Sequence, residues 1–187
     1  MVTLKKKTFG YNERCEKERE KFIKKLKTIK PEDIIYSDES GMDDNDVNME
    51  GWSMKGERLH DTKKSQRTDR ISFIAALNLK KLIAPFVFEG SCTRDVFETY
   101  LKEVLVPVLT PGKVLIIDNA SFHKGGRIKK IIKAAGCKIL YLPTYSPDFN
   151  PIEHCWAFIK GKIRKLLTTI NSNIYEVAIS VFESVVI

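Results

Sequence analysis

The sequence predicts a mixed α/β sheet with helices on its faces, and two observations indicate this fold class. Three strand-like runs follow one another in residues 33–88, and strand-like and helical patterns then alternate through residues 113–167. Consecutive strands joined by short turns pair antiparallel, whereas alternation of strands and helices is typical of parallel pairing. One sheet that contains both kinds of pairing accounts for the whole pattern.

Five strands are expected, each a short run rich in isoleucine, valine, leucine or phenylalanine. They cover residues 33–37, 71–79, 82–88, 113–117 and 137–142. Only Lys80 and Lys81 separate the second strand from the third, so these two form a hairpin, and the first three strands together predict an antiparallel meander. The last two strands belong to the alternating part of the chain.

Helices are expected in residues 12–29, 93–109, 124–135, 151–167 and 171–187. The first has apolar residues at helical spacing and ends before Pro31. Ser91 or Thr93 caps the second helix, and Gly136 stops the third. We expect the last helix to be loosely anchored.

These elements divide the chain into three segments. Residues 1–30 form a basic tail and a linker helix, residues 31–170 form the main domain, and residues 171–187 form a C-terminal helix. No apolar run approaches the length of a membrane helix, and the first residues lack the apolar core of a secretory signal. We therefore expect a cytoplasmic protein without a membrane partner.

The composition narrows the class of partner. The 187 residues carry a formal net charge of +8, which favours polyanions such as nucleic acids. The four cysteines are widely spread and form no C-x-x-C pair, so neither a zinc ribbon nor a disulfide framework is expected.

Three carboxylates are candidates for a catalytic metal centre. Asp38 follows the first expected strand, Asp118 follows the fourth, and Glu153 begins the helix of residues 151–167. Each position by itself also suits a turn former or the first turn of a helix. Hard divalent cations such as Mg²⁺ prefer oxygen ligands held on rigid elements, so the three together predict a site for such ions.

Several longer motifs occur in order around these carboxylates. They are Asp38-Glu39-Ser40-Gly41, Gly51-Trp52-Ser53 with Lys55-Gly56, Asp118-Asn119-Ala120-Ser121-Phe122-His123-Lys124, and Tyr145-Ser146-Pro147-Asp148-Phe149-Asn150-Pro151-Ile152-Glu153 with Trp156 and Lys160. This set resembles the catalytic domain of mariner-type bacterial insertion-sequence transposases, which belong to the DDE superfamily endonucleases. The 34 residues between Asp118 and Glu153 match the spacing characteristic of that family's aspartate-aspartate-glutamate triad.

The resemblance implies a ribonuclease-H-like fold with a mixed five-stranded sheet flanked by helices, and it makes residues 31–170 the catalytic domain. It implies that Asp38, Asp118 and Glu153 are both the catalytic residues and the ligands of two Mg²⁺ or Mn²⁺ ions. The implied reaction is hydrolysis at transposon ends, followed by attack of the freed 3′-hydroxyl on target DNA.

The residues expected to contact DNA lie beside the triad: Asn119, His123, Lys124, Lys160, Lys162 and Arg164. Other interpretations remain open for some of them. His123 also suits a helix cap or a packed imidazole, and the basic end of the last long helix also complements the helix dipole. Trp156 is expected to lie in the core rather than against a base.

The resemblance also implies partners, namely DNA, a second copy of the chain and a separately encoded helix-turn-helix half, because relatives carry such modules ahead of the catalytic domain. It implies association with the nucleoid. Two other functions stay open: a DNA endonuclease of the same fold that performs no strand transfer, and an inactive DNA-binding remnant of a truncated transposase.

Overall fold

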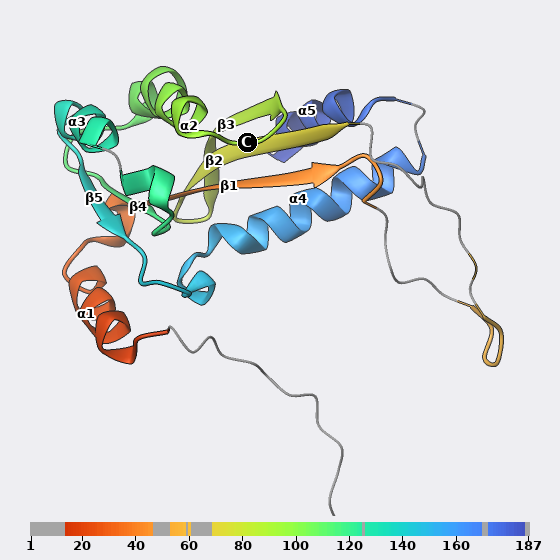
Figure 1. Cartoon of the computed structure of the whole chain (residues 1–187), viewed down its shortest axis with the longest axis horizontal. Helices are drawn as coiled ribbons and strands as arrows, with labels where there is room; N and C mark the ends of the chain where they lie inside the picture. Colours follow the sequence, from red (N-terminus) through yellow and green to blue (C-terminus); the bar gives the residue numbers. More distant parts are fainter. Residues whose placement is uncertain are drawn as a thin grey trace, which may run out of the picture.

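One five-stranded sheet organises the molecule in this computed structural model, which describes residues 14–46, 53–58, 60, 69–124, 126–169 and 172–185 (Figure 1). Its strands are β1 (Ile34–Asp43), β2 (Arg70–Asn78), β3 (Lys81–Glu89), β4 (Val114–Ile117) and β5 (Lys138–Tyr141). Their spatial order is β3-β2-β1-β4-β5, in which β2 pairs antiparallel with β1 and β3 while β4 pairs parallel with β1 and β5. The predicted mixed sheet is confirmed.

In the described residues, five α-helices pack around the sheet: α1 (Glu16–Leu26), α2 (Arg94–Tyr100), α3 (Gly126–Ala134), α4 (Ile152–Leu167) and α5 (Ile174–Val185). Of the two predicted caps of α2, Thr93 performs this role, because its Oγ1 accepts the N–H of Val96 at 3.4 Å. The predicted helix of residues 93–109 continues beyond α2 as a π-turn and a 3₁₀ turn. None of the helices in the described ranges is long and apolar enough to span a membrane.

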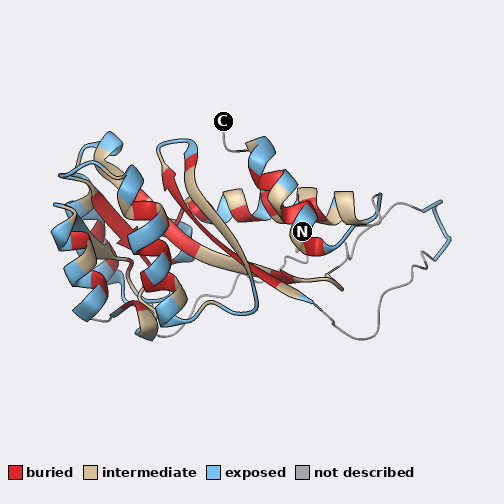
Figure 2. Cartoon of the chain, turned by 90° about the horizontal axis from the view of Figure 1, so that it is seen from above, coloured by how far each residue is buried: buried red, intermediate tan, exposed pale blue. Residues whose placement is uncertain are grey.

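The helices form a layer on each face of the sheet, which leaves the central strands buried between them (Figure 2). On one face, Trp156 of α4 and Phe182 of α5 pack against Phe73. On the other, Phe97 of α2 and Ile128 of α3 belong to a second buried cluster. A strand covered on both faces needs apolar side chains in both directions, and this explains the continuous apolar runs of β2 and β4.

The C-terminal helix corrects one prediction. We expected it to be loosely anchored, but α5 buries Ile174, Val177, Ala178, Val181 and Phe182 in the same core cluster as α4. The apolar residues of α5 recur at helical spacing, so their burial against β3 and α4 firmly attaches the helix to the domain. The proposed division into three segments stays a prediction, and residues 1–13 of the basic tail lie outside the described residues.

The first strand is longer than predicted. We expected it to end at residue 37, with Asp38 behind it, but β1 continues to Asp43 because β2 pairs with it as far as Arg70. On its other edge β1 pairs with β4 only up to Tyr36. Asp38 therefore lies inside the strand, two residues beyond the point at which β4 stops. Of the motif Gly51-Trp52-Ser53 with Lys55-Gly56, Gly51 and Trp52 lie outside the described residues, and residues 55–56 form a turn.

Candidate active site and metal centre

The three predicted carboxylates line one cavity of about 380 Å³. Asp38 comes from β1, Asp118 directly follows β4, and Glu153 lies in the first turn of α4. The carboxyl ends of parallel strands meet at one edge of a sheet, and residues 142–147 close the cavity from the side. Asp38 and Glu153, which are 115 positions apart in the chain, thus lie at the same cavity because rigid elements hold them there.

Asp38 is the buried member of the trio, with 8% of its surface exposed. Burial, followed by repulsion from Glu39 and Glu153, raises its pKa to about 8, although the indole N–H of Trp156 donates to its Oδ2 at 3.2 Å. Without a cation Asp38 therefore carries a proton at neutral pH. Trp156 is buried in the core as predicted, and the structure adds this hydrogen bond to its role.

Asp118 has the opposite character. Burial acts to raise its pKa, but the hydrogen bond from His123 and the backbone N–H of Ala120, which donates at 3.0 Å, outweigh this effect and lower it. The loop after β4 thus supplies an ionised carboxylate that is already oriented. One aspartate of the pair is neutral and buried while the other is charged and 42% exposed.

Glu39 is a site residue that the sequence reasoning missed. Neighbouring side chains in a strand point to opposite faces, so Glu39 turns away from Asp38 and lies 3.4 Å from Nε2 of His123. His123 also contacts Asp118 through Nδ1. The adjacent pair Asp38-Glu39 could have pointed to Glu39 as a site residue, because two neighbouring residues of a strand place one carboxylate on each face of the sheet.

His123 is fully buried, and its ring lies 4.2 Å from that of Phe97 and 4.1 Å from that of Phe122, measured between centroids. Burial acts to lower its pKa, but the hydrogen bond to Asp118 and the negative charges of Asp118 and Glu39 raise it to about 9. An imidazolium between two carboxylates orients both of them. The structure therefore favours the packed-imidazole interpretation of His123 over direct contact with DNA.

Of the other two predicted residues after β4, Asn119 lines the cavity, whereas Lys124 is not among its lining residues. Asn119 also donates from Nδ2 to Oγ1 of Thr144 at 3.0 Å, which ties the two loops together. Lys124 is exposed at the end of a 3₁₀ turn, and its charge contributes to the lowered pKa of Asp118.

The basic residues of α4 separate onto two faces. At about 100° per residue, Lys160 and Arg164 return to the face of Glu153, whereas Lys162 lies on the opposite face. Lys160 is partly buried; its pKa is lowered by burial and then by Arg164, while Glu153 acts to raise it. The ammonium of Lys162 lies 4.8 Å from the ring centroid of the exposed Phe158. Of the three basic residues of α4 that were predicted to contact DNA, only Lys160 and Arg164 therefore lie on the helix face that carries Glu153.

The donor set fits a hard divalent cation. Asp38, Asp118 and Glu153 line the same cavity with three carboxyl groups, and Mg²⁺ and Mn²⁺ are bound through such oxygens. In the part of the chain that the structure describes, no three potential ligands already stand in a binding arrangement. Glu153 is exposed at the rim, so its side chain can turn toward the two aspartates.

Comparison with known proteins identifies the family. Residues 33–173 match the family model described as DDE superfamily endonuclease. The chain belongs to this family. Among similar DDE proteins, the Tcb2 transposable element transposase of Caenorhabditis briggsae is 32% identical over 75 residues, which cover 38% of this chain and 28% of that protein. The matched segment thus spans less than a third of this relative.

Solved structures extend the likeness to the fold of this DDE endonuclease. The Mos1 strand transfer complex has a TM-score of 0.74 at 14% identity and covers 98% of this chain and 58% of that one. The mariner Mos1 paired end complex with Mg has a TM-score of 0.63 at 13% identity, with 98% and 64% covered. The ribonuclease-H-like fold is confirmed.

Proposed function

We propose that this domain catalyses metal-dependent phosphodiester hydrolysis at transposon ends and strand transfer of the 3′-hydroxyl into target DNA. The observation that carries this proposal is the single cavity shared by Asp38, Asp118 and Glu153. The similarity to the Tcb2 transposase and to the Mos1 strand transfer complex supports the same reaction.

In this proposal Asp38 and Asp118 hold two Mg²⁺ or Mn²⁺ ions jointly, and Glu153 completes the site. When bound, paired ions activate the attacking oxygen and stabilise the leaving oxygen in phosphoryl transfer. The Mos1 paired end complexes with Mn and with Mg support this choice of metal. Asp38 must lose its proton before it can bind, so metal affinity rises with pH toward the pKa of about 8.

The protein's own groups orient these ligands. Trp156 fixes Oδ2 of Asp38, and His123 holds Asp118 from one side while Glu39 holds the imidazole from the other. Such partners of ligating side chains set the orientation and basicity of the ligands. We assign Trp156, His123 and Glu39 as positioning residues.

The proposed partners are DNA at the nucleoid, a second copy of the chain and a separately encoded helix-turn-helix half that recognises the transposon ends. Asn119 lines the cavity and the exposed Lys124 follows in the same loop, where both can contact the DNA, and Lys160 and Arg164 lie on the same face of α4 as Glu153. The net charge of +8 supports a polyanionic partner.

The test is an assay that separates cleaved from joined DNA. The purified chain, with the upstream end-binding half supplied, is incubated with Mg²⁺, a labelled duplex carrying the element's own inverted repeat, and a supercoiled plasmid. Joined products are expected. Cleavage without joining would support the endonuclease alternative, and absence of both reactions with Mg²⁺ and Mn²⁺ would overturn the proposal.

The two faces of α4 give a second prediction. Replacing Lys160 and Arg164 with glutamine is expected to lower the salt dependence of DNA binding by about two contacts, a change of about 1.8 in the slope of log K against log salt. Lys162→Gln on the opposite face serves as the control and is expected to change this slope by less than about 0.5, the equivalent of about half a phosphate contact. Fluorescence anisotropy over a series of NaCl concentrations measures the slope, and equal slopes for all variants would contradict the assignment.

A further inference from the structure

Helix α1 lies ahead of the family-matched residues 33–173 and is fastened to the loop that leads into Glu153. The guanidinium of Arg19 donates from Nη1 to Oδ1 of Asp148 at 3.0 Å and from Nη2 to Oδ2 at 2.6 Å. The Arg19 side chain is only 7% exposed. Two parallel hydrogen bonds of this kind fix an orientation as well as a distance.

Aromatic contacts complete the attachment. The guanidinium carbon of Arg19 lies 3.8 Å from the ring centroid of Phe149, and the ring of Phe22 stacks on Phe149 at 5.6 Å with an interplanar angle of 14°. Arg19 and Phe22 are three residues apart and therefore share one face of α1. Figure 1 shows α1 at the end of the sheet at which α4 begins.

Short backbone hydrogen bonds connect this attachment to the catalytic glutamate. Asp148 and Phe149 belong to a 3₁₀ turn. The N–H of Asn150 donates to Pro147 at 2.8 Å, and the N–H of Glu153 donates to the carbonyl of Asn150 at 3.2 Å. Any rotation of the 3₁₀ turn therefore changes the direction in which α4 starts.

Packing alone does not require this ion pair. Phe22 already anchors α1 in a buried cluster with Val114, Ile116 and Leu142. The Asp148 side chain is 49% exposed, so the ion pair adds little stability compared with apolar packing, but its two parallel hydrogen bonds select one geometry. The geometry selected here is that of the loop ahead of Glu153.

We propose that Arg19 is a positioning residue for Glu153. By holding Asp148 and Phe149, it sets the start of α4 so that the Glu153 carboxylate reaches the ions shared with Asp38 and Asp118. The proposal rests on the metal-dependent function above. It makes α1 a component of the active site, although this helix carries none of the three carboxylates.

The test measures Mn²⁺ binding without DNA, by electron paramagnetic resonance of the free ion, on the full chain. Arg19→Ala is expected to weaken Mn²⁺ binding about tenfold, as loss of a supporting group around a metal ligand does, and Arg19→Lys to recover part of the loss. Lys21→Ala is the matched control, because the ion pair of Lys21 with Glu18 lies on the exposed surface of the same helix, and it is expected to leave the affinity unchanged. Melting temperatures identify variants that fail to fold. If Arg19→Ala does not fold, Asp148→Asn, which removes the other partner of the ion pair, is measured in its place.

A double-mutant cycle separates positioning from a general loss of order. In a Glu153→Gln background, Arg19→Ala is expected to cost no further Mn²⁺ affinity, because the group that Arg19 positions is already gone. An additive tenfold loss, or wild-type affinity in the single variant, would overturn the inference. Failure of the wild type itself to bind Mn²⁺ would instead overturn the proposed function.

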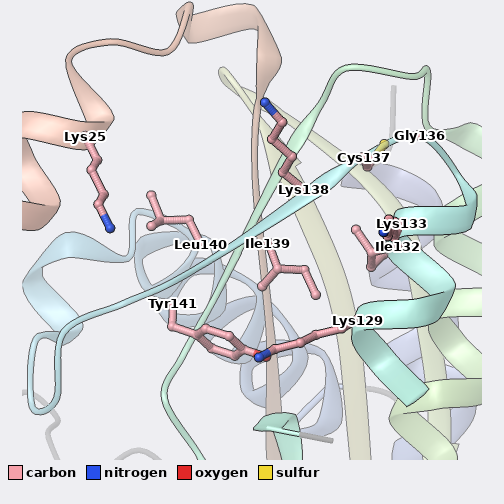
Figure 3. A pocket seen from close by; sticks show the side chains of 10 residues that line it. All are labelled: Lys25, Lys129, Ile132, Lys133, Gly136, Cys137, Lys138, Ile139, Leu140 and Tyr141. Atoms are coloured by element: carbon pink, nitrogen blue, oxygen red, sulfur yellow. The ribbon is translucent and has the colours of Figure 1, made fainter. Parts of the chain in front are cut away.

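A different observation carries a second proposal. A groove of about 870 Å³ runs along the outer strand β5, with Lys25 of α1 on one side and Lys129 and Lys133 of α3 on the other (Figure 3). The ten described residues that line it include four lysines, the fourth being Lys138, and no carboxylate. The groove is therefore strongly basic.

The groove leads toward the catalytic cavity. A smaller cavity of about 250 Å³ shares Lys25, Leu140 and Tyr141 with the groove. The same small cavity shares residues 142–144 and Asn119 with the cavity of the triad. The three hollows thus form one path along the edge of β5.

We infer that this path holds the phosphate backbone of a DNA strand that extends from the catalytic centre, which again rests on the proposed function. Charge favours this occupant over a peptide strand added to the free edge of β5, since four ammonium groups match regularly spaced phosphates. An added peptide strand would depend on backbone hydrogen bonds and be indifferent to these lysines.

The test compares two charge-matched triple variants in the Asp118→Asn background without metal. The first variant replaces Lys129, Lys133 and Lys138 with glutamine. It is expected to lower the slope of log K for DNA binding against log salt by about 2 to 3. The control variant carries glutamine in place of Lys80, Lys81 and Lys102, none of which lines the groove, and it is expected to change the slope by less than about 1. Equal slopes would overturn the inference, as would tight binding of an extended peptide that competes with DNA, while cleavage by the wild type reports separately on the proposed function.

Discussion

Asp118→Asn is expected to lower Mg²⁺-dependent DNA cleavage by about three orders of magnitude or more. An amide is a poor ligand for Mg²⁺, so the variant loses several kcal/mol of charge stabilisation in the transition state, and each 1.36 kcal/mol is about tenfold in rate. The fold should persist, because the asparagine oxygen can still accept from Ala120 and His123, as Asp118 does. Single-turnover cleavage of a labelled transposon-end duplex measures the effect.

Asp95→Asn is the matched control for this variant. Asp95 is 84% exposed and pairs with Arg127 on the surface, where an ion pair contributes little. Its replacement is expected to leave the rate within about twofold of the wild type, a surface effect of under 0.5 kcal/mol. Equal cleavage by wild type and Asp118→Asn would show that the carboxylate of Asp118 is dispensable, and absence of cleavage by both would leave this chain without the proposed activity.

Asp38→Asn is expected to change stability and activity in opposite directions. In the metal-free protein, burial and the carboxylates of Glu39 and Glu153 raise the pKa of Asp38 from 3.8 to about 8. The folded state then holds a proton that the unfolded state releases above about pH 4, so wild-type stability falls between about pH 4 and pH 8. The limit for one such group is about 1.4 kcal/mol per pH unit. An asparagine does not titrate, so the unfolding free energy of the variant does not fall with pH through this group.

Urea unfolding in the presence of EDTA at several pH values measures this difference. The variant is expected to exceed the wild type in unfolding free energy by a margin that grows from pH 5 to pH 8, whereas cleavage is lost. The pKa of His123 is raised to about 9, so its stabilising contribution declines with pH above about 6.5 in both proteins and cancels in the comparison. Saturating Mg²⁺ should reverse the order, because only the wild type gains binding energy. Parallel pH profiles would show that Asp38 is ionised in the metal-free fold.

Most of the fold followed from local pattern. The strand-like runs of β2, β3, β4 and β5 were placed within one or two residues of their observed limits, and the sheet contains the predicted mixture of pairing. The length of β1 was missed, because its second half is polar and acidic. It forms a strand through pairing with β2, and this pairing depends on residues 70–78.

The sequence by itself predicted the three carboxylates as candidates for one metal site and the strand-like runs of a mixed sheet, since these predictions depend on residue type, spacing and hydrophobic period. Tertiary structure decided the protonation of Asp38, the burial of His123 against Glu39 and the attachment of Arg19 to Asp148. The contact of Trp156 with Asp38 joins residues 118 positions apart, and that of Arg19 with Asp148 joins residues 129 positions apart. Such contacts and the burial that shifts a pKa arise only when distant segments pack, and no local pattern encodes them.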